Sequence, residues 1–281
     1  MHQKSGKASF GHIYDLEDPR EYYSTLGGMD YRAPEYGQRL FSKLVEKRSN
    51  GNGPVNVVDL CCSYGINAAL LKYDVALDDL YDRYSSDNLL LSGDELAESD
   101  AAYYADREKE DAPRVVGVDA AGNAVSYALK AGLLDAGAGE DLENEPPSEA
   151  LRREVSGADL FTVTGGIGYI SERTFDRLLG CVDEGRDPWV AVLALRWVSY
   201  DKISEVLGGY GLVTEKLEGH TFEQRRFADE EEQEYVCGEL ESMGIDTEGK
   251  EGDGSYHAEF YLSRPEEQAS EASVGELVGL G

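Results

Sequence analysis

Basic residues are scarce in this sequence: 26 lysines and arginines stand against 56 aspartates and glutamates, a formal net charge of -30. No lysine- or arginine-rich run occurs, so a nucleic-acid partner is not expected. Such self-repulsion strains a compact fold at ordinary ionic strength, but a Debye length of about 3 Å in 1 M salt largely removes it. The composition therefore predicts an acidic surface suited to a salt-rich, halophilic cytoplasm.

Long apolar runs are also missing. No stretch approaches the roughly 18 apolar residues of a membrane span, and the opening MHQKSGKASFGHIY lacks the apolar centre of a signal peptide. Hydrophobic residues make up 41% of the chain, which is enough to build a core. We expect a soluble, cytoplasmic protein with no membrane partner.

Cysteine and histidine are rare, with four of each. No CxxC pair, HExxH motif or other paired-ligand spacing occurs, so a metal site is not expected. The cysteines are predicted to be reduced and mostly buried. No pattern in the sequence predicts an oligomeric state.

Strand-like and helix-like segments alternate from residue 55 onward. Phe175, Leu178, Leu179 and Val182, for example, share one helix face behind an apolar run. Near-continuous apolar strands separated by amphipathic helices predict a doubly wound, mostly parallel α/β sheet. A period-two pattern over 255–264 favours an antiparallel last strand. The seven expected strands are 55–62, 114–120, 137–144, 158–166, 189–197, 212–219 and 255–264.

The remaining segments flank or interrupt this α/β domain, which we place at 51–265. Residues 1–50 predict a helical lead-in rich in tyrosine, and 266–281 predict a flexible tail. Residues 73–112 predict a helical insertion, because Leu77, Leu80, Tyr81 and Tyr84 keep helical spacing. The acids of this insertion are expected to form a solvated face.

The turn after the first strand, DLCCSYG at 59–65, lies where doubly wound folds bind ligands. Only Gly65 remains of a glycine-rich loop, and neither GxGxxG nor GxxxxGK[ST] is present. A dinucleotide or a nucleoside triphosphate is therefore poorly supported. The turn favours a ligand without phosphates, held by side chains and by close approach of the backbone.

VVDLCCSYG resembles motif I of the class I S-adenosylmethionine-dependent methyltransferases, the DLGCGTG type. VVGVDAAGNAVSYA resembles their second motif, with Asp119 as the acidic residue that ends the second strand. Cys61 and Ser63 stand where that family usually has glycine. The resemblance covers roughly 55–265 and implies a Rossmann-like methyltransferase fold with a seven-stranded sheet, the cofactor S-adenosyl-L-methionine, and methyl transfer by direct displacement.

The resemblance also implies roles for individual residues. Asp119, with Ala120 beside it, would bind the ribose hydroxyls, because a carboxylate offers several lone pairs to a diol. Glu143 or Asn144 would hold the adenine amino group. Nucleobase amino methylation is disfavoured, because TGGIGY is not the [DNS]PP[YFW] motif. The residues implied at the amino-acid end of the cofactor are Asp59, Cys61, Ser63 and Gly65, and those implied below the sulfonium are Thr164, Gly165 and Gly166.

The acceptor is expected to be a small molecule of unidentified chemistry, and no catalytic residue is assigned. Two alternatives remain open: a non-catalytic module of the same fold that binds S-adenosylmethionine or a related nucleoside, and a NAD-dependent oxidoreductase, against which the missing glycines count. Candidates for the substrate pocket are Tyr14, Tyr31, Tyr169, Arg196 and Trp197, and Asp30 and Glu172 are further candidates for a base.

Overall fold

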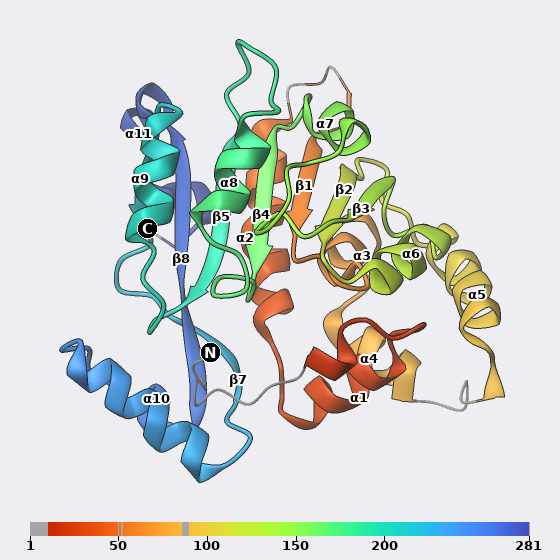
Figure 1. Cartoon of the computed structure of the whole chain (residues 1–281), viewed down its shortest axis with the longest axis horizontal. Helices are drawn as coiled ribbons and strands as arrows, with labels where there is room; N and C mark the ends of the chain where they lie inside the picture. The colour runs from red at the N-terminus through yellow and green to blue at the C-terminus, as the bar shows by residue number, and fades with distance from the viewer. Residues whose placement is uncertain (1–10, 50, 52, 86–89, 281) are drawn as a thin grey trace.

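The computed structural model describes residues 11–49, 51, 53–85 and 90–280. One sheet of eight strands runs through the molecule in the order β3-β2-β1-β4-β5-β8-β6, and β7 also pairs with β8 (Figure 1). The neighbours from β3 to β5 are parallel, whereas β8 is antiparallel to β5, β6 and β7. The strands are β1 Asn56–Leu60, β2 Arg114–Asp119, β3 Ala136–Gly139, β4 Leu160–Thr164, β5 Trp189–Leu195, β6 Leu212–Lys216, β7 Phe222–Arg226 and β8 Ser255–Pro265.

This topology confirms the predicted doubly wound α/β fold with an antiparallel last strand beside β5. Two details differ. Strand β3 is shorter than expected, and the chain after it forms a loop. Strand β7 was not predicted, because FEQRR lacks an apolar run, yet Gln224 and Arg225 in it are buried.

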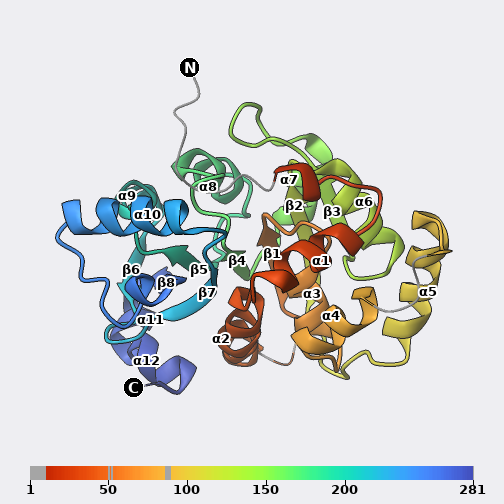
Figure 2. The ribbon, with the colours of Figure 1, turned by 90° about the horizontal axis from the view of Figure 1, so that it is seen from below.

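Helices cover both faces of the sheet. Helices α2 and α3 lie on one side of the sheet and α8 and α9 on the other (Figure 2). Successive residues of β1 serve these opposite faces: Val57 packs in the core with α2 and α3, whereas Val58 packs in the core with α7, α8 and α9. The helices are α1 Arg20–Gly28, α2 Ala33–Arg48, α3 Ile66–Lys72, α4 Leu77–Ser85, α5 Gly93–Ala105, α6 Gly122–Lys130, α7 Glu149–Val155, α8 Glu172–Leu179, α9 Asp201–Gly209, α10 Glu230–Ser242, α11 Glu266–Glu271 and α12 Val274–Val278, with short 3-10 turns η1 Gly11–Ile13 and η3 Glu251–Asp253.

The lead-in and the insertion pack against each other. Helices α1 and α4 lie side by side (Figures 1 and 2), and the Tyr23 and Tyr84 rings stack 4.4 Å apart. The expectation that the insertion acids form a solvated face is wrong at Asp100, which is fully buried. Its carboxylate accepts hydrogen bonds of 2.5 Å from Tyr84 and Tyr127 and pairs with Arg83, which compensates its burial.

Helices α11 and α12 occupy the region expected to be a flexible tail. Val274 and Val278 are buried. The buried Arg264 guanidinium donates to the carbonyls of Gln268 (2.9 Å) and Ala272, and it pairs with Glu215. A buried guanidinium needs acceptors, and this segment provides two of them. The sequence pattern alone did not reveal that requirement.

Candidate functional site

A cavity of about 410 Å³ lies at the carboxyl ends of β1, β2 and β4. Such an edge is where doubly wound sheets bind ligands. Its walls come from the turns after these strands, from the loop after β3, and from the lead-in that closes over them. The lining residues are Gly11, Tyr14, Asp15, Tyr22, Tyr31, Leu60, Cys61, Ser63, Val118, Asp119, Ala120, Ala121, Glu140, Asp141, Leu142, Glu143, Thr164, Gly165, Gly166, Tyr169, Ile170 and Thr174.

The turn after β1 is conformationally strained. Cys61 and Ser63 have left-handed φ angles of 54° and 49°, followed by Gly65 at 79°. A left-handed conformation costs a residue with a side chain roughly 1–2 kcal/mol, and such strain concentrates at functional sites. The Ser63 hydroxyl oxygen is buried and accepts or donates no hydrogen bond within the part of the chain that is described. A buried hydroxyl without a partner suits a polar ligand group.

Asp119 joins this turn to the end of β2. Its Oδ2 accepts from the Ser63 amide and its Oδ1 from the Ala121 amide, both at 2.9 Å. Burial raises the pKa of Asp119 above its ordinary value, although the amide hydrogen bonds oppose that shift. Each carboxylate oxygen keeps further acceptor capacity, so a vicinal diol could donate to both.

Asp59 lies beneath the turn and does not line the cavity. Its Oδ1 accepts from Asn67 Nδ2 (2.9 Å) and Thr162 Oγ1 (2.7 Å), and Asn67 Nδ2 also donates to Thr164 Oγ1 (3.1 Å). Complete burial raises the pKa of Asp59 to about 7. This network fixes β1, α3 and β4 relative to one another, so Asp59 supports the site from behind.

Gly65, also predicted at the cofactor, faces away from the cavity. A Cβ at this position would lie 3.2 Å from the Cβ atoms of Ala128 and Leu133. Gly166, in contrast, lines the cavity, and a Cβ there would lie 2.7 Å from Cys61 Sγ. The turns after β1 and β4 therefore meet closely at Gly166.

The loop after β3 forms one end of the cavity. Glu143 accepts hydrogen bonds from Ser171 N (2.8 Å), Ser171 Oγ (2.7 Å) and Thr174 Oγ1 (2.7 Å). Burial alone would raise the pKa of Glu143, but these hydrogen bonds outweigh it and lower that pKa. Asn144 instead donates to Asp141 (2.6 Å) and lies outside the cavity lining.

Four tyrosines from the lead-in and the loop after β4 form what we call the tyrosine wall: Tyr14, Tyr22, Tyr31 and Tyr169. The Tyr14 ring lies edge-to-face with Tyr22 (5.8 Å between centroids) and Tyr169 (6.5 Å). Burial raises the pKa of Tyr14 well above its ordinary value. The Tyr14 phenol is therefore neutral near pH 7.

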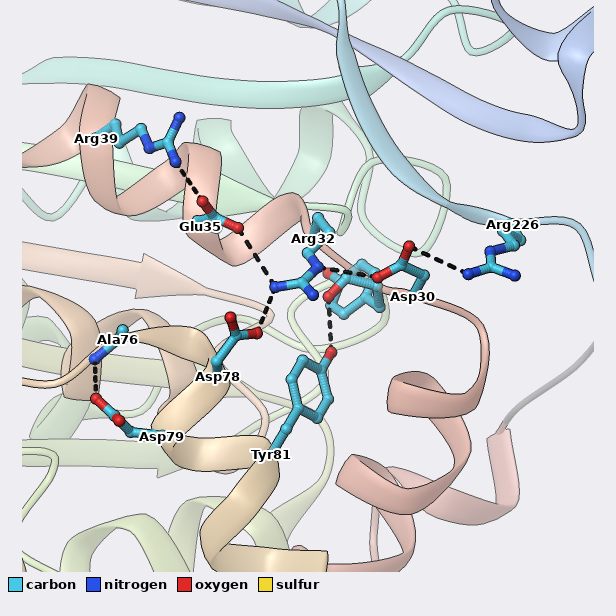
Figure 3. Close-up of polar contacts among 10 residues, drawn as sticks. Asp30, Arg32, Glu35, Arg39, Ala76, Asp78, Asp79, Tyr81 and Arg226 are labelled. Atoms are coloured by element: carbon cyan, nitrogen blue, oxygen red, sulfur yellow. Dashed lines mark hydrogen bonds and ion pairs between the residues drawn. The ribbon is translucent and has the colours of Figure 1, made fainter.

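An ionic cluster centred on Arg32 surrounds the turn that carries Tyr31, and Figure 3 shows its contacts with Asp30, Glu35 and Asp78. Arg32 pairs with Asp30 (3.0 Å) and with Asp78 of α4 (2.5 Å), and the Tyr31 carbonyl accepts from Tyr81 (2.7 Å). Asp30 also pairs with Arg226 of β7 at 3.4 Å. The turn between α1 and α2 is thus tied both to the insertion and to β7.

Arg196 and Trp197 were wrongly predicted at the pocket. Arg196 pairs with the buried Glu251 (2.5 Å) and donates to the Asp246 carbonyl (2.8 Å). Trp197 packs beside Tyr235 of α10, with 6.3 Å between ring centroids. Helix α10 packs against this end of β5 and contacts Trp197, whereas η3 and the loop after α10 bind Arg196. Glu172 and Asp30, the further candidates for a base, also lie outside the cavity lining.

Several lining residues were not predicted, among them Asp15, Tyr22, Glu140, Asp141 and Leu142. The last three lie in a stretch that was expected to continue the third strand. A short AGAG strand followed by EDLE was the available signal, because glycine and acidic residues weaken a strand. The only indication in the sequence that Tyr22 could line a pocket was the high tyrosine content of the lead-in.

No protein-family model and no curated protein matches this sequence. Solved structures similar in fold include magnesium protoporphyrin IX methyltransferase from Synechocystis PCC 6803 (11% identity, 82% of this chain and 79% of that chain, TM-score 0.40). Others are the plantazolicin methyltransferase BpumL (10%, 88% and 90%, 0.43) and the YcgJ protein from Bacillus subtilis (10%, 80% and 98%, 0.44).

Membrane-spanning helices and clusters of metal-binding side chains are both absent from the described ranges. None of their helices is long and apolar enough to cross a membrane. They also hold no group of three or more histidine, cysteine, aspartate or glutamate side chains that could bind a metal ion.

Proposed function

We propose that this chain is an S-adenosylmethionine-dependent methyltransferase that acts on a small-molecule acceptor. The observation that carries the proposal is the Asp119 carboxylate, which ends β2 and is hydrogen-bonded to the strained turn after β1 at the cavity edge. The sequence resemblance assigns these two segments to the cofactor. When bound, S-adenosylmethionine supplies an electrophilic methyl group to the acceptor.

The charges that line the cavity favour this cofactor over a dinucleotide. Within the ranges that the structure describes, no lysine, arginine or histidine lines it. A pyrophosphate would find no cationic partner there and would be repelled by the carboxylates. The sulfonium and ammonium groups of S-adenosylmethionine are positive and suit the same surroundings. The lining carboxylates are Asp15, Asp119, Glu140, Asp141 and Glu143.

The residues present fit the cofactor in distinct ways. Asp119 would accept from the ribose hydroxyls, and the unpartnered Ser63 hydroxyl would meet a polar group of the methionine part. Loop 140–143, with the buried Leu142, would hold the purine. Because Gly165 and Gly166 have no side chains, Tyr31 and Cys61 can lie close to the β4 turn on the acceptor side of the cavity. The tyrosine wall would line the side of the cavity left for the acceptor.

Calorimetric titration in molar KCl tests the proposal, with S-adenosylmethionine, S-adenosylhomocysteine and NAD as separate ligands. We expect micromolar binding of the first two and about tenfold or greater weakening in Asp119→Ala, the loss of a charge-assisted hydrogen bond. Binding of NAD alone by the folded protein would contradict the proposal. Cofactor binding without release of S-adenosylhomocysteine across an acceptor screen would favour a binding module.

A further inference from the structure

Among the residues that the structure describes, those lining the acceptor side of the cavity include aromatic rings and no cationic side chain. Tyr22 and Tyr169 each pack edge-to-face against Tyr14. The Tyr31 hydroxyl lies 3.2 Å from the position of a Cβ on Gly165. The tyrosine wall and the β4 turn therefore enclose the same space. Aromatic ring faces attract organic cations, and tyrosine clusters of this kind recognise ammonium groups.

One arginine, Arg225, lies near this wall, because its charge opposes the rise in the pKa of Tyr14, Tyr31 and Tyr169. The buried Arg225 guanidinium makes two hydrogen bonds to the Glu232 carboxylate, at 2.8 and 3.0 Å, and both side chains are at most 4% exposed. This pairing offsets part of the guanidinium charge. An anionic acceptor would consequently find this guanidinium already bound to a carboxylate, and it would face the carboxylates that line the cavity.

A buried hydrogen-bond acceptor is available beside the wall. Gln224 is 6% exposed, and its Oε1 has no hydrogen-bond partner anywhere in the described chain. Gln224 is not itself among the lining residues, but its Nε2 lies 2.8 Å from the position of a Cβ on the lining residue Gly165, so its side-chain amide lies directly behind the β4 turn. An unsatisfied buried carbonyl oxygen is best matched by an N–H donor.

We propose that the acceptor is a protonated organic amine, held by cation–π contact with the tyrosine wall and by an N–H donated to Gln224 Oε1. This inference rests on the proposed function and deepens it by naming the acceptor class. The amine must lose its proton before its nitrogen can act as a nucleophile, and that proton passes to water.

Titrations on the native chain saturated with S-adenosylhomocysteine test the inference. The probes share one shape: choline, its neutral carbon isostere 3,3-dimethylbutan-1-ol, and the anion 3,3-dimethylbutanoate. We expect choline to bind at least about tenfold more tightly than the neutral isostere and the anion to bind most weakly. Equal affinities of choline and its isostere, or preference for the anion, would overturn the amine proposal.

Three variants separate the two contacts. Tyr14→Phe should keep choline affinity within about threefold, whereas Tyr14→Leu should lose about tenfold, because only phenylalanine retains the ring. Gln224→Leu should weaken N,N-dimethylethanolammonium, which carries one N–H, and leave choline unchanged. Tyr235→Leu on α10, which lies outside the cavity lining, is the control and should leave all affinities unchanged. Uniform weakening of all probes by each variant would contradict the assignment.

Affinity for S-adenosylhomocysteine is measured in parallel, and it distinguishes the two ways of failing. If S-adenosylhomocysteine binds but choline is not preferred over its neutral isostere, only the acceptor class is ruled out. Absence of S-adenosylhomocysteine binding by the folded native chain sinks the proposed function, and the acceptor class falls with it.

Discussion

The Ser63 amide donates to Asp119 Oδ2 across 2.9 Å and thereby joins the turn after β1 to the end of β2. The two residues are far apart in sequence, and the insertion lies between them. The insertion therefore leaves the junction of the two motifs intact. Asp119 accordingly contributes to the fold of the site as well as to the binding we propose.

Replacement of Asp119 is expected to lower stability as well as affinity. Asp119→Ala leaves the Ser63 and Ala121 amides without their acceptor, which should cost about 1–3 kcal/mol of unfolding free energy. Urea denaturation in molar KCl measures this cost. Asp94→Ala removes an exposed carboxylate and is the control. Equal stability of the two variants would show that Asp119 is not structurally required.

Cys61 and Gly166 are predicted to be coupled. Gly166→Ala should destabilise the protein by roughly 1–3 kcal/mol, because the new Cβ would lie 2.7 Å from Cys61 Sγ. Adding Cys61→Gly removes that sulfur and also relieves the left-handed φ, so the double variant should recover much of the loss. A double-mutant cycle on unfolding free energies measures the coupling. Strictly additive effects would contradict the contact.

Arg32 is expected to matter more for the pocket than for global stability. Arg32→Gln breaks the partly exposed pairs with Asp30 and Asp78, so the unfolding free energy should fall by less than about 1 kcal/mol. Amide hydrogen exchange at Tyr31 and Arg32 should nevertheless accelerate. Arg39→Gln breaks the Arg39 pair with Glu35 and its contact with the Tyr36 ring but leaves the Arg32 pairs with Asp30 and Asp78 (Figure 3), so it is the matched control. Equal exchange in both variants would argue against a role for the cluster.

Asp59 should make stability fall as pH rises. Its pKa is raised from 3.8 to about 7 in the folded protein. The folded state therefore holds a proton that the unfolded chain releases, and the contribution present below about pH 4 is lost as pH rises through about 7. In Asp59→Asn this dependence should vanish, and the free-energy difference between native and variant should change by on the order of 2–4 kcal/mol across that window. Parallel pH profiles of native and variant would contradict the assignment.

Salt dependence tests the interpretation of the charge as halophilic adaptation. With a net charge of -30, the thermal midpoint should rise as KCl increases to molar concentrations. Asp106→Asn removes an exposed carboxylate at the C-terminal end of α5, where the helix dipole also disfavours it. This variant should be stabilised more at low salt than at high salt. A midpoint that is independent of KCl would rule out the adaptation.

Much of the fold was predictable because local patterns and topology agree. Apolar strands flanked by amphipathic helices have few compatible arrangements, and the period-two pattern around Tyr256 and Phe260 indicated the antiparallel β8. Strand β7 was not predicted because its side chains are buried by tertiary contacts. One is its pairing with β8, which is distant in sequence, and the other is the bond between Arg225 and Glu232 of α10. The same cause explains the order of the segment that follows β8.

The residues of the site were likewise predicted only where local sequence determines their position. The turn residues Cys61 and Ser63, and Asp119, were placed at the cavity because a motif fixes backbone position relative to a strand end. Arg196 and Trp197 were misplaced, because the end of a strand does not reveal which neighbouring element will take up its side chains. Asp59 was assigned to the ligand although its partners Asn67 and Thr162 lie within the protein.

The position of β8 between β5 and β6 constrains the order in which the chain can fold. Strand β6 is synthesised before β8, yet its only strand partner in the described sheet is β8. Strands β6 and β7 therefore emerge from the ribosome without a strand partner. They remain unpaired until β8 is synthesised and inserts between them and β5. Non-local pairing of this kind is slow and leaves edges open to aggregation. Chaperone demand during synthesis should consequently peak between the appearance of Leu212 and that of Pro265.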